Sequence, residues 1–313
     1  MSGANGRDRP VRHIFIINPH AGKKKSTRLL ERDIRALDAP CEVVFTKQAQ
    51  DARRIARLAA ESGEDVRLYA CGGDGTLNEV VNGAAGFANA AVTNVPIGTG
   101  NDFLKIFGKN ARRRFLDLKA LSAGPQAAMD LIDCNGRLGI DIVCTGVDAR
   151  IAADKDRYNA LPLVGGIGAY IMSLVENVLF KGISVPTAVD CGDLHYEGET
   201  SLVCVCSGRY YGGGFMPVGD NMPDDGQLEV LVVRKVSRVT FFRLVKAYGS
   251  GRYRDYPELI WYRRENGVTV RGERELAVAV DGEVRWEKEL NIRLSEKKVN
   301  FFYPADVDYA HPG

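Results

Sequence analysis

Through about residue 125 the chain alternates short apolar runs with helical segments, and three of the apolar runs end in turns rich in glycine or asparagine. Strands are predicted at His13–Asn18, Cys41–Thr46, Val66–Cys71 and Ala91–Ile97, and helices at Lys25–Leu37, Asp51–Glu61 and Thr76–Ala85. This alternation is typical of an α/β fold with a doubly wound parallel sheet. Such sheets bind ligands at the carboxyl ends of their strands, so we expect these turns to share one functional edge.

After about residue 126 the pattern changes to short β-like runs. Strands are predicted at Gly139–Cys144, Ile183–Val189, Ser201–Cys206, Leu228–Val233, Val268–Val270, Leu276–Val280, Leu290–Leu294 and Val299–Phe302. Helices are predicted at Gly165–Lys181 and Ser237–Tyr248, the second with Ser237 as N-cap and Gly249 as C-cap. We therefore expect a flexible N-terminus (1–10), an α/β domain (11–127) and a β-rich antiparallel, sandwich-like domain (128–313). Whether the last strand returns to the first domain is left open.

Composition excludes several classes of protein. The 42 Lys and Arg residues against 40 Asp and Glu give a net charge of +2, so the chain is not a general polycation for nucleic acid. Seven cysteines without a CxxC pair, and no secretory leader, favour reduced thiols in a cytoplasmic protein. Residues 1–10 are polar and have no apolar h-region, so we expect no signal peptide. The longest apolar stretch, Leu161–Phe180, contains Pro162 and Glu176, so we expect no transmembrane segment.

The sequence GGDGTLNEV, from Gly72 to Val80, is the sharpest motif. Its glycines allow backbone N–H groups to approach a polyanion, and the helix that begins at Thr76 points its positive N-terminus toward the same anion. Asp74 would repel phosphate unless a metal ion lies between them, which is the arrangement of a magnesium nucleotide. The alternative is a tight strand-to-helix turn in which the aspartate is a cap.

Two further turns resemble this one in position. PIGTGNDF, from Pro96 to Phe103, carries Thr99 and Asp102, and the second aspartate suggests two carboxylates that converge on one cation. Asp102 as a simple helix cap is the alternative. NPHAGKKKS, from Asn18 to Ser26, adds a glycine and three lysines. The lysines either bind phosphate as point charges or form the solvated, basic start of a helix.

Familiar nucleotide motifs are absent. GKKKS lacks the leading glycine of a P-loop, and GGDGTLN has Asn78 where the dinucleotide fingerprint needs glycine. The segments NP…G, GGDGTLNEV, GTGNDF, YYGGG (Tyr210–Gly214), DDGQLEV (Asp224–Val230) and VDGE (Val280–Glu283) nevertheless occur in a fixed order. This order resembles the soluble bacterial lipid kinases with a diacylglycerol kinase catalytic domain, which are related to sphingosine and ceramide kinases. GGDGT alone is shared with NAD kinases and phosphofructokinases, whose nucleotide domain the first domain is expected to resemble.

The resemblance implies roles for individual residues. The residues that match the family's ATP site are Asn18, Pro19, His20, Ala21, Gly22, Lys23, Thr46, Gly72, Gly73, Asp74, Gly75, Thr76, Leu77, Asn78, Glu79, Thr99 and Asp102. Asp74, Asp102 and Glu283 match the ligands of the catalytic magnesium, and Asp281 matches the general base. Asp225, with the carbonyls of Met222 and Gln227, matches a second, structural magnesium site. Asp130 matches an aspartate that pairs with a lysine, here Lys23. Ala21 departs from the serine that many members carry.

The implied reaction is transfer of the γ-phosphoryl group of ATP, with magnesium, to a lipid hydroxyl, with diacylglycerol as the first expectation. The alternative for the DG pair at Asp281 is a simple hairpin turn at the end of a strand. Basic and aromatic residues are interleaved from Lys235 to Arg264, and this pattern predicts contact with the anionic inner face of a membrane. The alternative is a helix whose basic face is simply exposed to water. No nucleic acid partner is expected, and a homodimer is left open. The alternatives are a soluble small-molecule kinase of the NAD kinase type and a non-catalytic lipid- or nucleotide-binding regulator.

Overall fold

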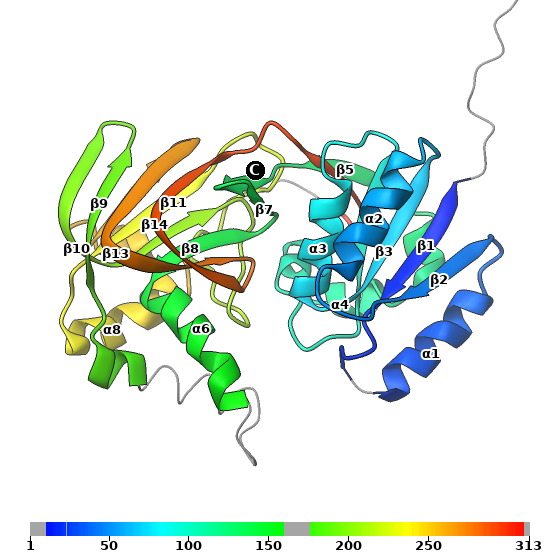
Figure 1. The fold of residues 1–313 in the computed structure, drawn as a ribbon, viewed down its shortest axis with the longest axis horizontal. Helices are drawn as coiled ribbons and strands as arrows, with labels where there is room; N and C mark the ends of the chain where they lie inside the picture. The colour runs from blue at the N-terminus through cyan, green and yellow to red at the C-terminus, as the bar shows by residue number, and fades with distance from the viewer. Residues whose placement is uncertain (1–10, 23, 160–175, 310–313) are drawn as a thin grey trace, which may run out of the picture. The chain divides into compact units, whose positions relative to one another are not determined.

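A computed structural model describes residues 11–22, 24–159 and 176–309 (Figure 1). The chain divides into two compact units, which we describe separately. Unit 1 comprises the described residues up to Met129 together with those from Lys297 onward, and unit 2 runs from Asp130 to Glu296. Lys23 and most of the predicted helix Gly165–Lys181 lie outside the described residues, and the end of that helix, Asn177–Lys181, forms a π-helical turn (η2).

Unit 1 contains a six-stranded sheet in the order β2-β1-β3-β4-β15-β5. Its strands are β1 (Arg12–Ile17), β2 (Cys41–Phe45), β3 (Val66–Gly72), β4 (Ala90–Pro96), β5 (Gln126–Met129) and β15 (Val299–Phe302). Its helices are α1 (Lys24–Arg35), α2 (Asp51–Glu61), α3 (Asp74–Ala84), η1 (Phe103–Phe107), α4 (Ala111–Arg114) and α5 (Leu118–Ser122). All neighbouring strands are parallel except β15 and β5. The predicted parallel-sheet domain is therefore confirmed.

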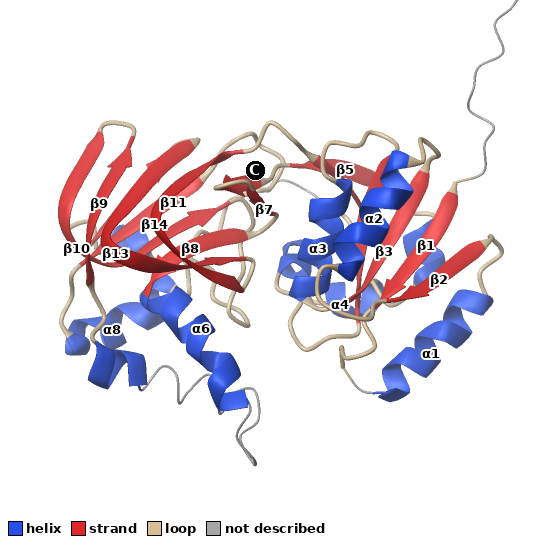
Figure 2. Ribbon diagram, viewed as in Figure 1, coloured by secondary structure: helices blue, strands red, loops and turns tan. Residues whose placement is uncertain are grey.

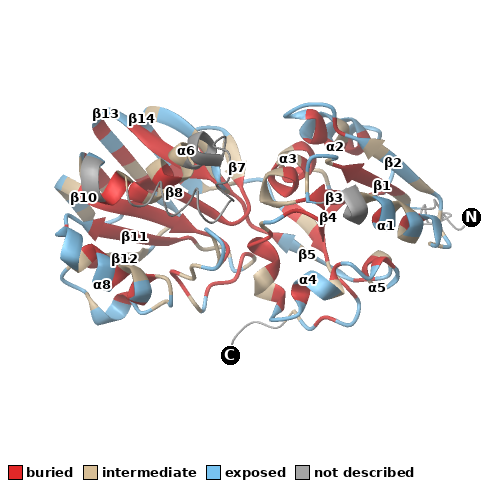
Figure 3. Cartoon of the chain, turned by 90° about the horizontal axis from the view of Figure 1, so that it is seen from below, coloured by how far each residue is buried: buried red, intermediate tan, exposed pale blue. Residues whose placement is uncertain are grey.

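The sheet of unit 1 is buried because helices cover it. Figure 3 shows α2 and α3 on one side of the strands and α4 and α5 on the other. Strands β3 and β4 are buried almost throughout, as expected for central parallel strands with both faces covered. Since β1, β3 and β4 run parallel, their carboxyl ends and the turns that follow lie along one edge.

Unit 2 is rich in β-strands (Figure 2). Its strands are β6 (Ile132–Cys134), β7 (Arg137–Gly139), β8 (Ile142–Gly146), β9 (Val185–Cys191), β10 (Leu194–Cys206), β11 (Glu229–Arg234), β12 (Ile260–Arg264), β13 (Gly267–Val280) and β14 (Glu283–Leu294). They form one sheet in the order β12-β11-β10-β8-β13-β14-β6-β7, and β9 pairs with both β10 and β13. All pairings between these strands are antiparallel, which confirms the predicted β-rich domain.

Alternation along β10 shows how the two faces of this sheet are used. Val203 and Val205 enter an apolar cluster formed by the strands alone, whereas Leu202, Cys204 and Cys206 enter a second cluster that includes helices. Those helices are α6 (Val147–Asn159) and α8 (Arg238–Tyr248), with the short η3 (Tyr253–Asp255) after α8. The predicted caps of α8 are confirmed, because Ser237 accepts a hydrogen bond from the Thr240 N–H and Gly249 ends the helix.

Several predicted boundaries were wrong. The predicted strand Gly139–Cys144 is in fact the end of β7 and the start of β8. The two predicted strands Val268–Val270 and Leu276–Val280 form the single strand β13, which is interrupted by a bulge. Helix α6 and strand β12 were not predicted.

Candidate functional site

Three turns pack closely at the carboxyl edge of β1, β3 and β4. Gly22 has φ +69°, and a Cβ there would lie 2.0 Å from the Ile97 carbonyl oxygen. A Cβ on Gly98 would lie 2.6 Å from the Gly73 amide nitrogen. These are approaches of backbone to backbone, so a side chain at Gly22 or Gly98 would separate the turns. The predicted convergence of the three turns on one edge is therefore present within unit 1.

Asp74 joins the second turn to the third. Its Oδ2 accepts a hydrogen bond from the Asn101 N–H at 2.9 Å, and its Oδ1 accepts one from the Asp102 N–H at 2.8 Å. A Cβ on Gly100 would lie 2.2 Å from the same Oδ2, so the carboxylate needs glycine at this position. The Asp74 side chain thus holds the GTGND backbone in place, whatever else it binds.

Asn101 and Arg112 support the third turn, and the sequence interpretation missed both. Asn101 has φ 140°, and its side-chain oxygen Oδ1 accepts a hydrogen bond from Asn94 Nδ2 at 3.1 Å. Arg112 Nη2 donates to the Gly98 carbonyl at 2.8 Å. Asn101 lies inside the GTGNDF motif and could have been found there, but nothing in the sequence signals the contact that Arg112 makes.

The first turn reaches the start of α3. Asn18 Nδ2 donates to Thr76 Oγ1 at 3.3 Å, and Asn18 Oδ1 accepts from the His20 N–H at 2.9 Å. A Cβ on Gly72 would lie 2.2 Å from Thr76 Oγ1. Gly73 is the N-cap residue of α3 and offers no capping side chain. No side chain caps this N-terminus, and a helix N-terminus of this kind can bind phosphate through its backbone N–H groups.

The other predicted nucleotide residues of unit 1 differ in exposure. Pro19, His20, Gly22 and Thr99 are exposed, whereas Ala21, Gly73 and Gly75 are half-buried. Gly72, Thr76, Leu77, Asn78, Asp102 and Thr46 are buried. Asp102 forms an ion pair with Lys105, one helical turn along the chain. Thr46 follows β2, and its N–H donates to the Ile17 carbonyl, which places it beside the end of β1.

Glu79 is used to hold a neighbouring helix. Its two carboxylate oxygens accept hydrogen bonds from the backbone N–H groups of Gln50 (2.9 Å) and Ala52 (3.1 Å). Gln50 is the N-cap residue of α2 and its own side chain forms no capping bond. Glu79 therefore supplies the cap of α2 from α3, which satisfies N–H groups that would otherwise lack partners.

Asp281 lies in unit 2, at the tip of the hairpin between β13 and β14. Its φ of 47° and that of Gly282, 88°, are the two left-handed positions of a type I′ turn. Its Oδ2 accepts from the Ile140 N–H at 2.8 Å, and its Oδ1 accepts from the Asp141 and Ile142 N–H groups, both at 3.0 Å. The carboxylate thus holds the segment between β7 and β8 as well as occupying the predicted catalytic position.

Glu283 begins β14 on the other side of the same turn. It pairs with Val280 in the hairpin, and its side chain is exposed. Asp74 and Asp102 belong to unit 1, whereas Asp281 and Glu283 belong to unit 2. Within the described ranges, no three His, Cys, Asp or Glu side chains form a group that could hold a metal ion. Asp74 and Asp102 nevertheless fit magnesium chemically, because carboxylate oxygens are its preferred ligands and a carboxylate can accept two N–H bonds and still bind a cation.

The DDG loop of unit 2 already contains a cation. Asp225 forms an ion pair with the Arg264 guanidinium, whose Nε lies 3.1 Å from the buried Glu229. Asp225 Oδ1 also accepts from the Gln227 N–H at 3.0 Å, and the Met222 side chain is buried. A metal ion at Asp225 would compete with Arg264 for the carboxylate, as one at Asp102 would compete with Lys105, so the second magnesium site stays a prediction. Nearby, Asp130 accepts a hydrogen bond from the Gly226 N–H at 2.7 Å, which ties it to the same loop.

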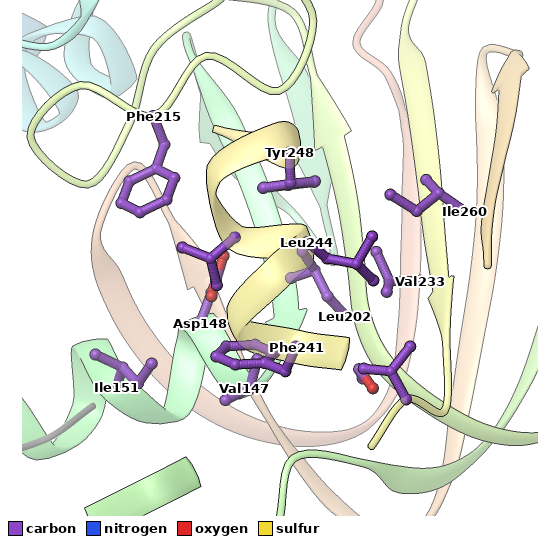
Figure 4. A pocket seen from close by; sticks show the side chains of 13 residues that line it. Val147, Asp148, Ile151, Leu202, Phe215, Val233, Phe241, Leu244, Tyr248 and Ile260 are labelled. Atoms are coloured by element: carbon purple, nitrogen blue, oxygen red, sulfur yellow. The ribbon is translucent and has the colours of Figure 1, made fainter. Parts of the chain in front are cut away.

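An apolar pocket lies in unit 2 between α6, α8 and the sheet (Figure 4). Val147 and Ile151 of α6, Leu202 and Val233 of the sheet, and Phe241 and Leu244 of α8 are among its lining side chains. Asp148 is the acidic group in this lining. Burial raises the pKa of its carboxyl above the ordinary value of 3.8, and a hydrogen bond from Tyr211 opposes that shift. The Tyr211 hydroxyl also lies 3.3 Å from that of Tyr248.

Comparison with known proteins agrees with this arrangement. The diacylglycerol kinase catalytic domain family matches residues 12–134, and the YegS C-terminal NAD kinase beta sandwich-like domain matches residues 141–301. Diacylglycerol kinases of Staphylococcus epidermidis (strain ATCC 12228) and Staphylococcus aureus (strain MRSA252) are each 27% identical, over 303 and 298 residues. Each alignment covers 94% of this chain and 92% of the relative.

A crystal structure of a diacylglycerol kinase from Bacillus anthracis has the same fold, with a TM-score of 0.69 and 22% sequence identity, and the match covers 95% of this chain and 98% of that one. The two matched domains and the sheet edge together define the class of protein: the chain is a lipid kinase. It belongs to the family of bacterial diacylglycerol kinases, as the order of its motifs predicted.

Proposed function

We propose that this lipid kinase transfers the γ-phosphoryl group of ATP to a lipid hydroxyl, with diacylglycerol as the first candidate acceptor and phosphatidic acid as the product. The observation that carries the proposal is the edge of unit 1, where Asp74 joins two glycine turns beside the uncapped start of α3. Backbone N–H groups and a helix N-terminus bind phosphate oxygens, and close turns allow them to approach.

In this proposal the residues of unit 1 bind and orient the nucleotide. The N–H groups at the start of α3 hold its phosphates, and Asn18 keeps Thr76 in position through the hydrogen bond between their side chains. Asp74 and Asp102 would hold a magnesium ion, which would neutralise charge on the phosphates. Glu283 is proposed as a further ligand on the grounds of the sequence motif. Phosphoryl transfer depends mainly on such positioning and charge neutralisation.

Asp281 is proposed as the group that accepts the proton of the attacking hydroxyl. A carboxylate positioned near an alcohol serves as a general base in this chemistry. The three backbone N–H groups that donate to Asp281 fix the orientation of its carboxylate.

The apolar pocket of unit 2 supports a lipid as the acceptor. An acyl chain would gain about 0.8 kcal/mol for each methylene transferred from water into such a lining. A soluble acceptor such as NAD would not use this surface. No helix within the described part of the chain is both long and apolar enough to cross a bilayer. We propose that the enzyme works in the cytoplasm and reaches its lipid by peripheral contact with the inner membrane face.

The proposal is tested with γ-labelled ATP and a panel of acceptors in mixed micelles. The panel contains diacylglycerol, a sphingoid base, phosphatidylglycerol and undecaprenol, with NAD as the soluble control. We expect magnesium-dependent labelling of diacylglycerol and none of NAD. Labelled NAD with unlabelled lipids would refute the lipid acceptor, and labelling of another lipid alone would replace diacylglycerol.

A further inference from the structure

The arginines of the segment that follows α8 are matched by carboxylates. Their ion pairs are Arg252 with Asp255 (4.0 Å), Arg254 with Asp220 (3.8 Å), Arg263 with Asp193 (3.1 Å), and Arg264 with both Asp225 and Glu229. An arginine with an acidic partner offers little net charge to an anionic surface. The part of the predicted membrane-facing region from Arg252 to Arg264 is therefore not a strong cationic patch.

Helix α8 differs from that segment. Its exposed face carries Val239 and Phe242, which are 64% and 55% exposed, and the two cations Arg243 and Lys246. The four positions are spaced i, i+3, i+4 and i+7, so they lie on one side of the helix. We call these four residues the α8 outer face. Within the described ranges, neither Arg243 nor Lys246 has an ion-pair partner, and α8 itself has no acidic residue.

The helix is held firmly enough to present this face. Ser237 caps its first turn, and Phe241, Leu244 and Tyr248 on the opposite side are buried against the sheet and α6. Because the buried side holds the helix in place, the exposure of Val239 and Phe242 does not result from a loosely packed element. Large apolar side chains exposed together on one face usually mark an interaction surface.

Charge decides which partner fits the α8 outer face. A second copy of the chain, packed through the same face about a two-fold axis, would bring like charges together. The phosphate groups of an anionic bilayer would instead pair with Arg243 and Lys246, while Val239 and Phe242 enter the boundary with the acyl chains. The combination of two exposed apolar side chains with two unpaired cations thus favours a lipid surface.

The inner side of the same helix lines the apolar pocket. Phe241, Leu244 and Tyr248 point into it from α8, as Figure 4 shows. Only the thickness of one helix therefore separates the α8 outer face from the pocket. We propose that α8 docks the enzyme on the anionic membrane surface through Val239, Phe242, Arg243 and Lys246, and so brings the apolar pocket to the lipid. The second part of this inference rests on the proposed lipid acceptor, and the first part does not.

The test measures binding of the full-length protein to vesicles by co-sedimentation. Vesicles of phosphatidylcholine alone are compared with vesicles that also contain phosphatidylglycerol. The double variant Arg243→Gln/Lys246→Gln should bind the anionic vesicles about 25-fold more weakly, at about fivefold for each cation, and should lose most of the dependence on phosphatidylglycerol. Val239→Ser/Phe242→Ser should weaken binding to both kinds of vesicle by about tenfold or more.

Matched controls separate this surface from its surroundings. Arg252→Gln/Arg263→Gln removes the same number of cations from the paired arginines, and Trp286→Ser removes an exposed aromatic residue that is 52% exposed on β14. Both controls should bind like the wild type, and all four variants should keep its thermal midpoint. Equal binding by the α8 variants and the wild type would overturn the inference. So would an equal loss in the controls, or a wild type that binds neither kind of vesicle.

Kinase activity in detergent micelles keeps the two proposals distinct. A wild type that labels no lipid in micelles, but binds vesicles through α8, would refute the proposed acceptor and leave the docking surface. A wild type that labels diacylglycerol, with α8 variants that bind vesicles normally, would refute the docking surface alone.

Discussion

Asp281 offers the sharpest test of the proposed chemistry, because the structure gives its carboxylate two tasks. It accepts three backbone N–H groups, from Ile140, Asp141 and Ile142, and it is the proposed base. The substitution Asp281→Asn keeps the size of the side chain and tolerates the left-handed turn. It exchanges one oxygen for an NH₂ group, which cannot accept a hydrogen bond.

The magnitude follows from the hydrogen bonds. The asparagine oxygen is best placed at the Oδ1 position, where it accepts from Asp141 and Ile142. The NH₂ group then faces the Ile140 N–H, and Ile140 is buried. A buried donor left without a partner costs about 1–3 kcal/mol, so we expect the free energy of unfolding to fall by about that amount. Loss of the base should separately reduce kcat about 10²–10⁴-fold, while the affinity for ATP changes little.

The assay combines urea unfolding, ATP binding by calorimetry and a pH profile of lipid phosphorylation on one preparation. Asp255→Asn, at an exposed position in the same unit, is the control and should change stability by less than about 0.5 kcal/mol. A wild-type free energy of unfolding in Asp281→Asn would show that the three hydrogen bonds contribute nothing. An unchanged pH profile with a lower kcat would assign Asp281 to positioning and remove it as the base.

Three further predictions concern single side chains. Asp74→Asn leaves one N–H of the GTGND turn facing an NH₂ group, so it should lower the free energy of unfolding by about 1–3 kcal/mol in urea as well as reduce turnover. Gly98→Ala should lower the free energy of unfolding by about 1–3 kcal/mol and weaken ATP binding in calorimetry, because the new Cβ would meet the Gly73 backbone. Gly267→Ala, with open space around the new Cβ, should leave stability and ATP binding unchanged. Asp148→Asn removes a carboxyl whose pKa is raised by burial, so the folded wild type holds this proton more tightly than the unfolded chain does. The variant should therefore gain stability relative to the wild type as the pH rises above about 3.8. Urea midpoints of the two proteins that stay parallel from about pH 4 to about pH 7 would contradict this.

Elements whose signals are local could be predicted from the sequence. The helix Asp51–Glu61 and the strand Val299–Phe302 have the predicted bounds, because each is set by periodicity and by the residues at its ends. The GGDGT turn was placed correctly between a strand and a helix for the same reason. Apolar strands that run directly into glycines leave few alternatives for the backbone.

Elements without a local sequence pattern could not be predicted. The strand Gln126–Met129 pairs with Val299–Phe302, more than a hundred residues later, and its own sequence has no alternation. The strand Ile260–Arg264 contains two arginines and was read only as a basic surface, yet it pairs with β11. Helix α6, which directly follows β8, has weak amphipathicity, so its sequence shows no clear helical pattern.

The carboxylates of the candidate site show the same limit at the level of single atoms. The motifs identified Asp74, Glu79 and Asp281 as residues for chemistry, but each one accepts backbone N–H groups from another segment. These contacts cross from one turn or helix to the next, so no spacing in the sequence reveals them. Removing any of these side chains therefore changes the backbone beside it as well as the charge. Loss of activity in an alanine variant cannot by itself assign a catalytic role at these positions, and only an isosteric variant measured for both folding and ligand binding separates the two effects.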